Sequence, residues 1–315
     1  MSYADKLFVQ NANNIIKNGT DTRGQLVRPK WPDGTPAYTI KQFGVVNNYD
    51  LRKEFPAITL RPVALKSCMD EILWIYQRKS NNILDLKPHI WDQWADDTGS
   101  IGKAYGYQVG KKYLHHVHKM TAGCLMDTSE IEGFKKLYPS IEFEYSDGNY
   151  NVYMDQMDAV IYDLRNAPYG RRIMISLWNP DELHEMRLQP CCWSITFNVT
   201  NEGDDKLILN MHLNQRSNDF LAANAWNVCQ YAILLMMVAQ VTNMKPGVLM
   251  HCITDEHIYD RHVDLVKQLI SRDQFPAPKV SLNPEITDFY KFTTDDLIVE
   301  NYQHGIQIPK IPIAE

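Results

Sequence analysis

The chain has 315 residues, of which 44% are hydrophobic and 22% are charged, and its formal net charge is -6. This is an ordinary globular composition, and the length can bury a sizeable core as one large domain or two small ones. The acidic balance argues against a general nucleic-acid-binding surface, because such surfaces carry a basic excess.

The cysteines and the apolar runs indicate the compartment. The six cysteines lack the paired spacing of a disulfide scaffold or a zinc site, so we expect a reducing, cytosolic compartment and no metal. The first residues lead into a polar segment without the apolar stretch of a signal peptide, so we expect no export. The longest apolar run, residues 231–239, is too short to span a bilayer and predicts a buried helix.

The amino-terminal part begins with an amphipathic pattern. Leu7, Phe8 and Ile15 lie among polar residues and predict a short helix over residues 3–17, ending near Gly19. A loop comes next, in which Arg28 stands within a run of Pro, Gly and charged residues over positions 28–35. Such a loop either grips an anion or is an ordinary solvated surface loop.

The next segment places a carboxylate on an apolar helix. We expect a short strand over residues 58–60, then a helix whose apolar residues recur at helical spacing, namely Ala64, Cys68, Ile72 and Ile75. Glu71 lies inside this stretch, and partial desolvation there would raise its pKa toward values useful for proton transfer. Because Glu is rarely fully buried, a solvated or ion-paired side chain is the commoner outcome.

The middle of the chain is rich in aromatic residues and then becomes less interpretable. Trp91 and Trp94 lead through two glycines to Tyr105, and these rings could wall a flat ligand or simply fill the core. Residues 109–153 contain a predicted hairpin turn at residues 146–149 and three histidines, His115, His116 and His118. Without carboxylate or cysteine partners at ligand spacing, surface histidines are favoured over a metal site.

A helix over residues 154–165 precedes Arg171 and Arg172, which open a predicted strand over residues 173–178. Two arginines at a strand start form either a second anion grip or a solvated edge. We consider the two arginines as candidate anion-binding residues because their strand leads on toward Cys191.

Cys191 stands where the chain changes from proline to an alternating pattern. Polar Ser194, Thr196 and Asn198 alternate with apolar neighbours and predict a strand that begins just after Pro190, so the thiol lies at the rim of a sheet. A free cysteine is usually a small buried apolar residue. A second alternating strand over residues 207–213 changes this expectation, because it leads to Gln215, Arg216 and Ser217.

An arginine, a hydroxyl and an amide together suit a phosphate monoester, and the field of Arg216 would lower the pKa of a nearby thiol. Beyond this point Asn227 lies near the start of the buried helix over residues 226–241, as a binding amide or a cap. His257 and Tyr259 lie two residues apart in an extended segment and therefore share a face.

Taken together, these segments resemble the thymidylate synthase family. The matching motifs keep the family's order along nearly the whole chain, and they include Phe55-Pro56, Glu71-Ile72-Leu73-Trp74, Ile90-Trp91-Asp92-Gln93-Trp94, Tyr105-Gly106, Arg171-Arg172, Trp178-Asn179, Pro190-Cys191, Gln215-Arg216-Ser217, Asp219, Asn227 and Asp255 with His257-Ile258-Tyr259.

The resemblance implies a mixed α/β fold, in which a twisted, mostly mixed sheet is covered by helices on one face and forms a homodimer through the other. It implies one catalytic domain over residues 1–315, with residues 109–153 as an insertion or small subdomain.

By the same resemblance, the reaction is the reductive methylation of dUMP by 5,10-methylenetetrahydrofolate, giving dTMP and dihydrofolate. Cys191 attacks carbon 6 of the uracil, which is covalent catalysis. The catalytic set implied is Cys191, Glu71, Tyr105, Asn227 and Asp219. The dUMP-binding set implied is Arg28, Gln215, Arg216, Ser217, Asn227, His257 and Tyr259, with Arg171 and Arg172 donated across the dimer interface. The folate-binding set implied is Trp91, Asp219 and Ala314.

This sequence departs from the family pattern in several places. Cys192 stands where histidine is common, and the segment Asn224-Ala225-Trp226 stands where Pro-Phe often precedes the asparagine. Ala223 lies near a common glycine, Arg61 replaces a lysine, and the chain finishes on Glu315 instead of an apolar residue. We therefore expect altered polar contacts around the uracil carbonyl and altered packing against the pterin.

Two alternatives stay open on sequence alone. One is a pyrimidine-nucleotide hydroxymethylase of the same superfamily, acting on dUMP or dCMP, in which water captures the methylene group. Asn227 argues against cytosine and Trp91 against water entry. The other is an inactive nucleotide- or RNA-binding relative, which the retained Cys191, Glu71 and Arg216 make the weaker choice.

Overall fold

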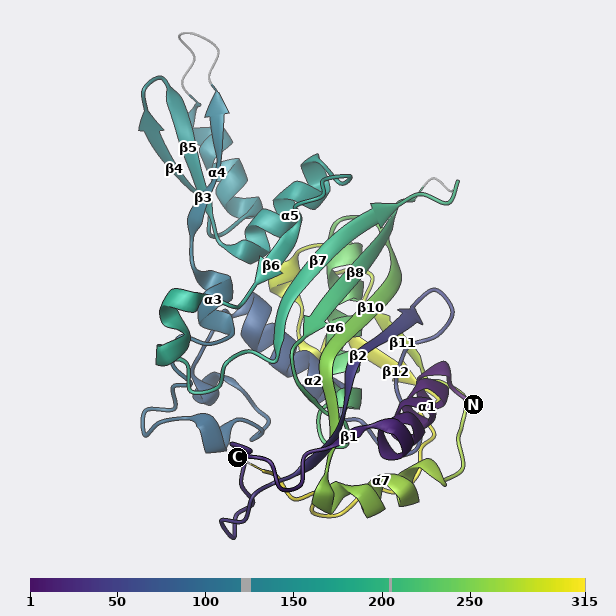
Figure 1. The fold of residues 1–315 in the computed structure, drawn as a ribbon. Coiled ribbons are helices and arrows are strands. Elements are labelled where there is room, and N and C mark those ends of the chain that lie inside the picture. Colours follow the sequence, from purple (N-terminus) through teal and green to yellow (C-terminus); the bar gives the residue numbers. More distant parts are fainter. Residues whose placement is uncertain (120–125, 204–205, 315) are drawn as a thin grey trace.

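A computed structural model describes residues 1–119, 126–203 and 206–314 of the chain (Figure 1). The helices are α1 (Tyr3–Asn18), α2 (Leu65–Ile72), α3 (Gly106–Gly110), α4 (Thr128–Leu137), α5 (Gln156–Asn166), α6 (Asn224–Val241) and α7 (Val263–Ile270). The strands are β1 (Thr20–Asp21), β2 (Thr39–Asp50), β3 (Tyr113–Lys119), β4 (Glu142–Ser146), β5 (Asn149–Met154), β6 (Met174–Ser176), β7 (Cys192–Thr200), β8 (Ile208–Gln215), β9 (Asn218–Asp219), β10 (Lys245–Tyr259), β11 (Lys279–Leu282) and β12 (Leu297–Glu300).

The main sheet is mixed. Its strands lie in the order β1-β2-β10-β8-β7-β6, and β9 pairs with β10. The pairing of β10 with β8 and with β9 is parallel, whereas all other neighbours along this order are antiparallel. Strand β7 begins just after Cys191, and strand β8 ends just before Arg216. Because the two strands are antiparallel neighbours, both predicted site segments lie at the same edge of the sheet.

Helices cover one face of this sheet, with α6 and α2 behind it in Figure 1. Helix α6 is buried on nearly all sides because its sequence is apolar all round, as expected for a central core helix. The strand residues that face it form a cross-strand row of apolar side chains, Tyr49, Leu249, Met211 and Phe197. Helix α2 continues directly into a wide π turn over Leu73–Gln77.

No helix of the described residues covers the opposite face (Figure 1). The side chains on this face include another cross-strand row, Asn48, Met250, His212, Thr196 and Met174, all of them half-buried or exposed. Strand faces that carry apolar groups such as Met174, at 45% exposure, are typical of surfaces that meet a partner. The expectation of a mixed α/β fold with helices on one face is therefore confirmed.

A second, smaller sheet stands at one end of the molecule (Figure 1). It has the order β3-β5-β4, and the predicted hairpin turn is present at Asp147-Gly148, where both residues have positive φ. Phe134 of α4 packs against Phe143 of β4 at 5.8 Å between ring centroids. These elements lie within the predicted segment 109–153, except that β5 extends to Met154. Within this segment, Cys124 is outside the described residues.

The predicted strand over residues 58–60 is wrong. The segment is buried, but its polar groups bond to side chains and loops instead of a neighbouring strand: Thr59 N–H donates to Asp5 Oδ1 at 2.7 Å, and the Tyr302 hydroxyl donates to Ile58 O at 2.8 Å. Sequence reasoning also missed β2, whose polar composition includes Gln42, Asn47 and Asn48.

Candidate active site

Cys191 lies just before β7, half-buried at the edge of the main sheet. Pro190 precedes it, and the Arg216 N–H donates to Cys191 O at 2.9 Å, which ties the start of β7 to the end of β8. The Arg216 Nη2 atom is 3.7 Å from the Cys191 Sγ atom. Burial raises the pKa of the Cys191 thiol, while the charges of Arg216 and Arg28 oppose this rise. Arg216 thus lowers the pKa of the thiol as expected, but the effect of burial is larger.

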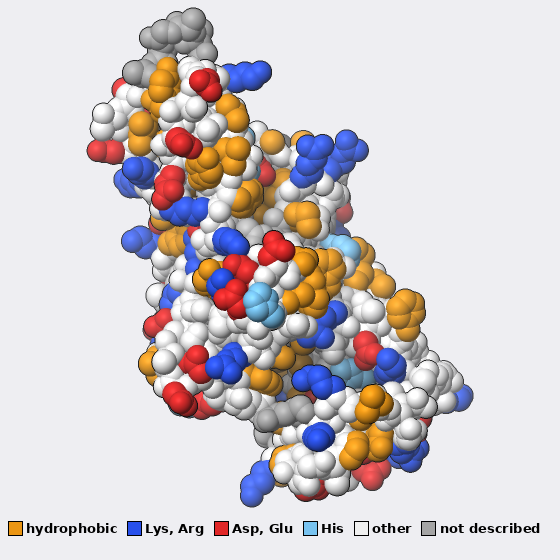
Figure 2. Space-filling view, turned by 60° about the vertical axis from the view of Figure 1, so that its left-hand side comes forward, with side chains coloured by type: hydrophobic (Ala, Val, Ile, Leu, Met, Phe, Trp, Pro, Cys, Tyr) orange, Lys and Arg blue, Asp and Glu red, His pale blue; other side chains and the backbone are white. Residues whose placement is uncertain are grey.

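The guanidinium of Arg216 is held by the backbone. Its Nε donates to Pro190 O at 3.0 Å and its Nη2 to Gln189 O at 2.8 Å. The same group lies over the Trp178 ring, 5.8 Å from its centroid. The charge is therefore fixed beside the thiol. Figure 2 shows basic side chains bordering a hollow near the middle of one face of the molecule.

Tyr105 lies between the thiol and the buried interior. Its hydroxyl accepts a hydrogen bond from Cys191 N–H at 3.2 Å, and its ring meets that of Trp91 edge-on at 4.9 Å. Burial, and then the nearby Cys191, raise the pKa of Tyr105 well above its ordinary value, and Glu71 adds to the rise. The backbone of Tyr105 has φ 45°, a left-handed conformation that costs free energy unless its surroundings hold it.

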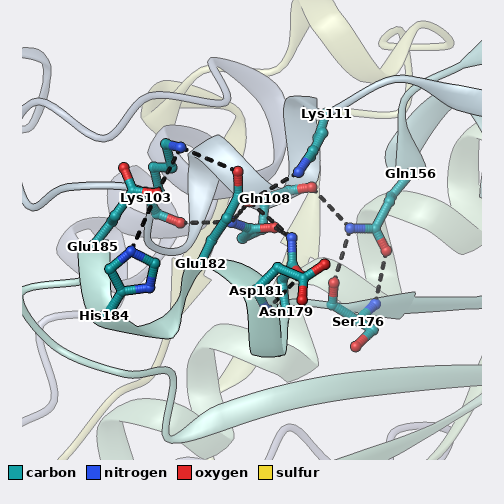
Figure 3. A network of polar contacts seen from close by, with 10 residues as sticks. All are labelled: Lys103, Gln108, Lys111, Gln156, Ser176, Asn179, Asp181, Glu182, His184 and Glu185. Atoms are coloured by element: carbon teal, nitrogen blue, oxygen red, sulfur yellow. Dashed lines mark hydrogen bonds and ion pairs between the residues drawn. The ribbon is translucent and has the colours of Figure 1, made fainter.

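A polar network holds the loop that carries Tyr105 (Figure 3). The Gln108 amide donates to Lys103 O at 2.8 Å and to Glu182 Oε2 at 2.9 Å, which closes the turn around Tyr105. Glu182 also accepts from Lys111 at 2.9 Å, and these contacts with Gln108 and Lys111 lower the pKa of Glu182. The network is a rigid support for the strained residue.

Glu71 is buried, with 6% of its surface exposed. The indole N–H of Trp91 donates to its Oε1 at 2.9 Å, and the indole N–H of Trp226 donates to its Oε2 at 2.7 Å. Burial raises the pKa of Glu71 to about 7, although both indoles and Gln230 oppose the rise. Of the two environments considered for Glu71, solvated or desolvated, the structure shows the desolvated one.

Asn227 is the fourth residue of α6 and does not cap the helix. Its Oδ1 accepts from Gln215 Nε2 at 3.1 Å, and its Nδ2 donates to Gln230 Oε1 at 3.0 Å. Gln215 Nε2 also donates to the backbone oxygen of Ser217 at 3.0 Å, and Gln215 Oε1 lies 2.7 Å from His251 Nε2. This chain of bonds fixes which end of the Asn227 amide is the donor.

Asp219 lies at the base of the site beside the carboxyl-terminal segment. Burial alone would raise its pKa, but the contact with His262 and the N–H of Ala222 outweigh it and leave the pKa below its ordinary value. His262 is 3.6 Å from Asp219 Oδ1 and 2.7 Å from Pro312 O, on opposite ring nitrogens. Ala314 lies two residues further along, and Glu315 lies outside the described residues.

His257 and Tyr259 share a face of β10 as predicted, with ring centroids 5.1 Å apart. Asp255 bonds to His257 Nδ1 at 2.8 Å. Burial raises the pKa of Tyr259 to about 12, with Asp219 adding to the rise and Arg28 opposing it, so the exposed Arg28 acts on both Tyr259 and Cys191.

Arg171 and Arg172 are the predicted site residues that one chain does not bring to Cys191. Both are exposed, just before β6. The Phe197 N–H donates to Ile173 O at 2.8 Å, and Phe197 is six residues from Cys191 along β7. At about 3.3 Å a residue, this places the arginines roughly 20 Å from the thiol.

The chain is similar to known proteins over nearly its whole length. The thymidylate synthase family model matches residues 6–314. Thymidylate synthase 1 of Bacillus subtilis is 38% identical over 309 residues, 97% of each chain, and the thymidylate synthase of Bacillus mojavensis is equally similar. The solved structure of the thermostable thymidylate synthase A from Bacillus subtilis matches all of both chains with a TM-score of 0.81 and 36% identity.

The chain belongs to the thymidylate synthase family. Its activity is accordingly that of a thymidylate synthase, a methyltransferase of dTMP biosynthesis. These findings do not favour a hydroxymethylase or an inactive binding relative.

Membrane-spanning helices and metal-ligand clusters are both absent from the described ranges, 1–119, 126–203 and 206–314. None of the helices there is long and apolar enough to cross a membrane. Nor do three His, Cys, Asp or Glu side chains gather there as metal ligands would. His115 and His116 instead bond to each other, with 2.7 Å between their Nδ1 atoms.

Sequence reasoning missed four polar residues that contact predicted site residues, namely Trp226, Gln230, His251 and His262. Trp226 was noticed as a departure from the family, but a lone tryptophan gives no sign of which acceptor it will meet. Cys192, the other departure, is buried against Tyr231, and burial raises the pKa of Cys192 well above its ordinary value. The thiol makes a hydrogen bond with the Tyr231 side chain, which opposes this rise.

Proposed function

We propose that the chain converts dUMP and 5,10-methylenetetrahydrofolate to dTMP and dihydrofolate, with Cys191 as the nucleophile. The observation that carries this proposal is the arrangement around Tyr105. The backbone N–H of Cys191, whose thiol lies beside Arg216, donates to the Tyr105 hydroxyl. The ring of Trp91 meets Tyr105 edge-on, and its indole donates to Glu71, whose pKa is about 7.

The covalent step begins and ends at the Cys191 sulfur. The thiolate adds to carbon 6 of the uracil, and the electron pair of the 5,6 double bond makes carbon 5 nucleophilic. Carbon 5 takes up the one-carbon unit and loses its proton as the bond between that unit and the folate nitrogen breaks. A hydride then adds to the one-carbon unit, the 5,6 double bond re-forms, and the Cys191 sulfur leaves. When bound, the folate supplies the methylene group and the hydride that together become the methyl group.

The polar groups near Asn227 suit the uracil ring. Because Gln215 Nε2 donates to Asn227 Oδ1, the Asn227 amide has a fixed orientation and presents one acceptor and one donor. This pair complements the carbonyl and N–H of a uracil edge. Cytosine reverses both contacts, because its exocyclic amine donates and its ring N3 accepts.

The phosphate grip must be shared among several residues. The Nε and Nη2 atoms of Arg216 contact Pro190, Gln189 and Cys191. Among the described contacts, its Nη1 atom is the donor left for a phosphate. Arg28 and Ser217 complete the near side. Arg171 and Arg172, roughly 20 Å away at about 3.3 Å per residue of β7, would reach the same phosphate only from a partner subunit.

A homodimer through the uncovered face of the main sheet accounts for this geometry. That face is the one with the half-buried and exposed row from Asn48 to Met174, and Arg171 and Arg172 lie just before the edge strand β6. In this proposal each site contains two arginines of the partner subunit.

The remaining residues have roles in binding and proton transfer. His257 and Tyr259 would bind the ribose hydroxyl from their shared face of β10. Glu71 would relay protons at the pyrimidine, and Tyr105 would lie near the water that removes the carbon 5 proton. The ionised Asp219 leaves Oδ2 without a described partner, which fits the N–H groups of a pterin, with Trp91 and Ala314 lining the folate site.

We also infer one catalytic domain over residues 1–315, in which residues 109–153 form a peripheral insertion. The protein would act in the cytoplasm and require no nucleic acid. The first inference rests on the family and on the separate three-stranded sheet, and the second rests on the family.

The test is an incubation with dUMP and 5,10-methylenetetrahydrofolate, in which dihydrofolate is followed by absorbance and the nucleotide is identified by mass. Cys191→Ser is measured beside the parent chain, with Cys252→Ser as a control cysteine outside the site. Dihydrofolate and dTMP that disappear only in Cys191→Ser are expected. Hydroxymethylated nucleotide with tetrahydrofolate, or dUMP binding without turnover, would contradict the proposal.

A further inference from the structure

The side chain of Trp226 makes a contact that the proposed mechanism does not use. Trp226 is the third residue of α6, next to Asn227, and α6 packs across α2, which carries Glu71. Its indole N–H points at Glu71 Oε2, 2.7 Å away. One turn of α6 therefore holds both the amide proposed to read uracil and a donor to the carboxyl group.

We propose that Trp226 is a positioning residue: together with Trp91 it holds Glu71 as a carboxylate, and so decides below which pH the proton relay stops. This inference rests on the proposed role of Glu71 in proton transfer. It assigns to Trp226 a chemical task, and not merely the filling of space at the crossing of α2 and α6.

The donor chemistry selects one form of Glu71. An indole N–H can only donate, so it never accepts the proton of a neutral carboxyl group. With Trp91 on Oε1 and Trp226 on Oε2, both oxygens must accept. A protonated Glu71 has one hydroxyl oxygen, and that oxygen would turn its proton toward a donor. Protonation therefore weakens the two hydrogen bonds, because a neutral carboxyl group accepts less strongly than a carboxylate.

Burial acts in the opposite direction. Glu71 is only 6% exposed, and the desolvation of its charge favours the neutral form. The two indoles, with Gln230, oppose this effect and leave the pKa near 7, where a group can both accept and return a proton. Loss of either indole donor would leave burial less opposed and raise the pKa further.

The two indoles are not equivalent. Trp91 belongs to an aromatic cluster with Trp74, Trp94 and Tyr105, so its substitution would disturb packing as well as the hydrogen bond. Trp226 makes no ring contact among the described residues that is comparable with these. Trp226→Phe is therefore the cleaner way to remove one donor and keep an aromatic side chain.

The direct test is a pH titration of Glu71 in the unliganded protein by carbon-13 NMR of labelled glutamate, with the signal assigned by its loss in Glu71→Gln. A hydrogen bond to a charged group corresponds to about one pKa unit or more, so Trp226→Phe should raise the titration midpoint by about one unit. Trp31→Phe is the matched control, because this buried indole donates to Asp260 Oδ1 at 3.0 Å and its ring meets Tyr259 and His262 and not Trp91. Its midpoint should equal that of the parent chain.

The kinetic test separates positioning from packing. The pH profile of kcat/KM reports the free enzyme, so the limb that belongs to Glu71 should move upward in Trp226→Phe by the same amount as the NMR midpoint. At a pH well above both midpoints, kcat should return to within about twofold of the parent value, whereas a packing defect lowers it at every pH.

An unchanged Glu71 midpoint in folded Trp226→Phe, or an equal shift in Trp31→Phe, overturns the proposal. If Trp226→Phe does not fold, Trp226→Met, an unbranched apolar residue without a donor, is subject to the same criteria. If the parent chain makes no dTMP but the midpoint still shifts, the proposed function fails while the pairing of Trp226 with Glu71 stands.

Discussion

The outer and inner halves of the site are built by different physical means. In the outer half, around Cys191 and Arg216, the charged side chain is fixed by backbone carbonyls and lies near solvent. In the inner half, around Glu71 and Asn227, side chains bond to other side chains and are largely buried. Burial raises the pKa of both Cys191 and Glu71. The charges of arginines oppose the rise at Cys191, whereas neutral hydrogen-bond donors oppose it at Glu71.

The two halves are therefore vulnerable in different ways. A hydrogen bond between two buried side chains leaves an unsatisfied group when either partner is changed, which is more costly than the loss of a solvated contact. We expect inner substitutions to change the chemical step and its pH dependence. Outer substitutions that keep the nucleophile Cys191 should change mainly the binding of the nucleotide.

The largest effect among these variants is expected for Glu71→Gln. The amide has the same shape but cannot relay a proton, so kcat/KM should fall by about 10²- to 10⁴-fold. Because burial raises the pKa of Glu71 to about 7, the limb of the pH profile near neutrality should also vanish. Initial rates over a range of pH would check this, and a variant that keeps both the rate and the limb would remove Glu71 from the mechanism.

Arg216→Lys tests the outer half. An ammonium group lacks the planar fork that reaches Gln189 O and Pro190 O together, so KM for dUMP should rise by about 10- to 100-fold with a smaller change in kcat. Arg165→Lys is the control, since Arg165 also donates to a backbone oxygen, that of Val241 at 3.0 Å. A larger loss in kcat than in KM would show that the outer half also acts in the chemical step.

Tyr105→Phe probes the boundary between the halves. It leaves the Cys191 N–H without its acceptor, a cost of about 1–2 kcal/mol, so kcat should fall by about 5- to 30-fold. Tyr76→Phe loses a buried hydroxyl that meets the Tyr231 hydroxyl at 3.1 Å, and serves as the matched control. Equal losses in the two variants would mean that the effect is general packing.

The smallest effect is expected for Cys192→Ala, although this residue is adjacent to the nucleophile. Its thiol is buried and its pKa is raised, so activity should stay within about twofold while the free energy of unfolding falls by about 1 kcal/mol. Steady-state rates and urea denaturation measure the two quantities. A loss of activity comparable with that of Cys191→Ser would place Cys192 in the outer half after all.

The outer half could be predicted from the sequence because its residues come in contiguous motifs at strand ends. Strand alternation placed Cys191 and Arg216 at one edge of the sheet, and helical spacing placed Glu71 correctly. The residues Glu71 and Asn227 of the inner half could also be predicted, but their contacts could not, since Trp226 meets Glu71 only because α6 crosses α2, 155 residues away in sequence. Strand β2 was missed because its polar residues hide the period of two.

The wide turn at Leu73–Gln77 limits how the length of this chain can change. A π turn holds one residue more than an α turn, so deletion of any residue there would regularise the helix. One residue corresponds to about 100° of rotation in an α-helix. Either Glu71 would turn away from the two indoles, or Tyr76 would turn away from Tyr231. In an alignment, this stretch should therefore tolerate substitution but not a gap.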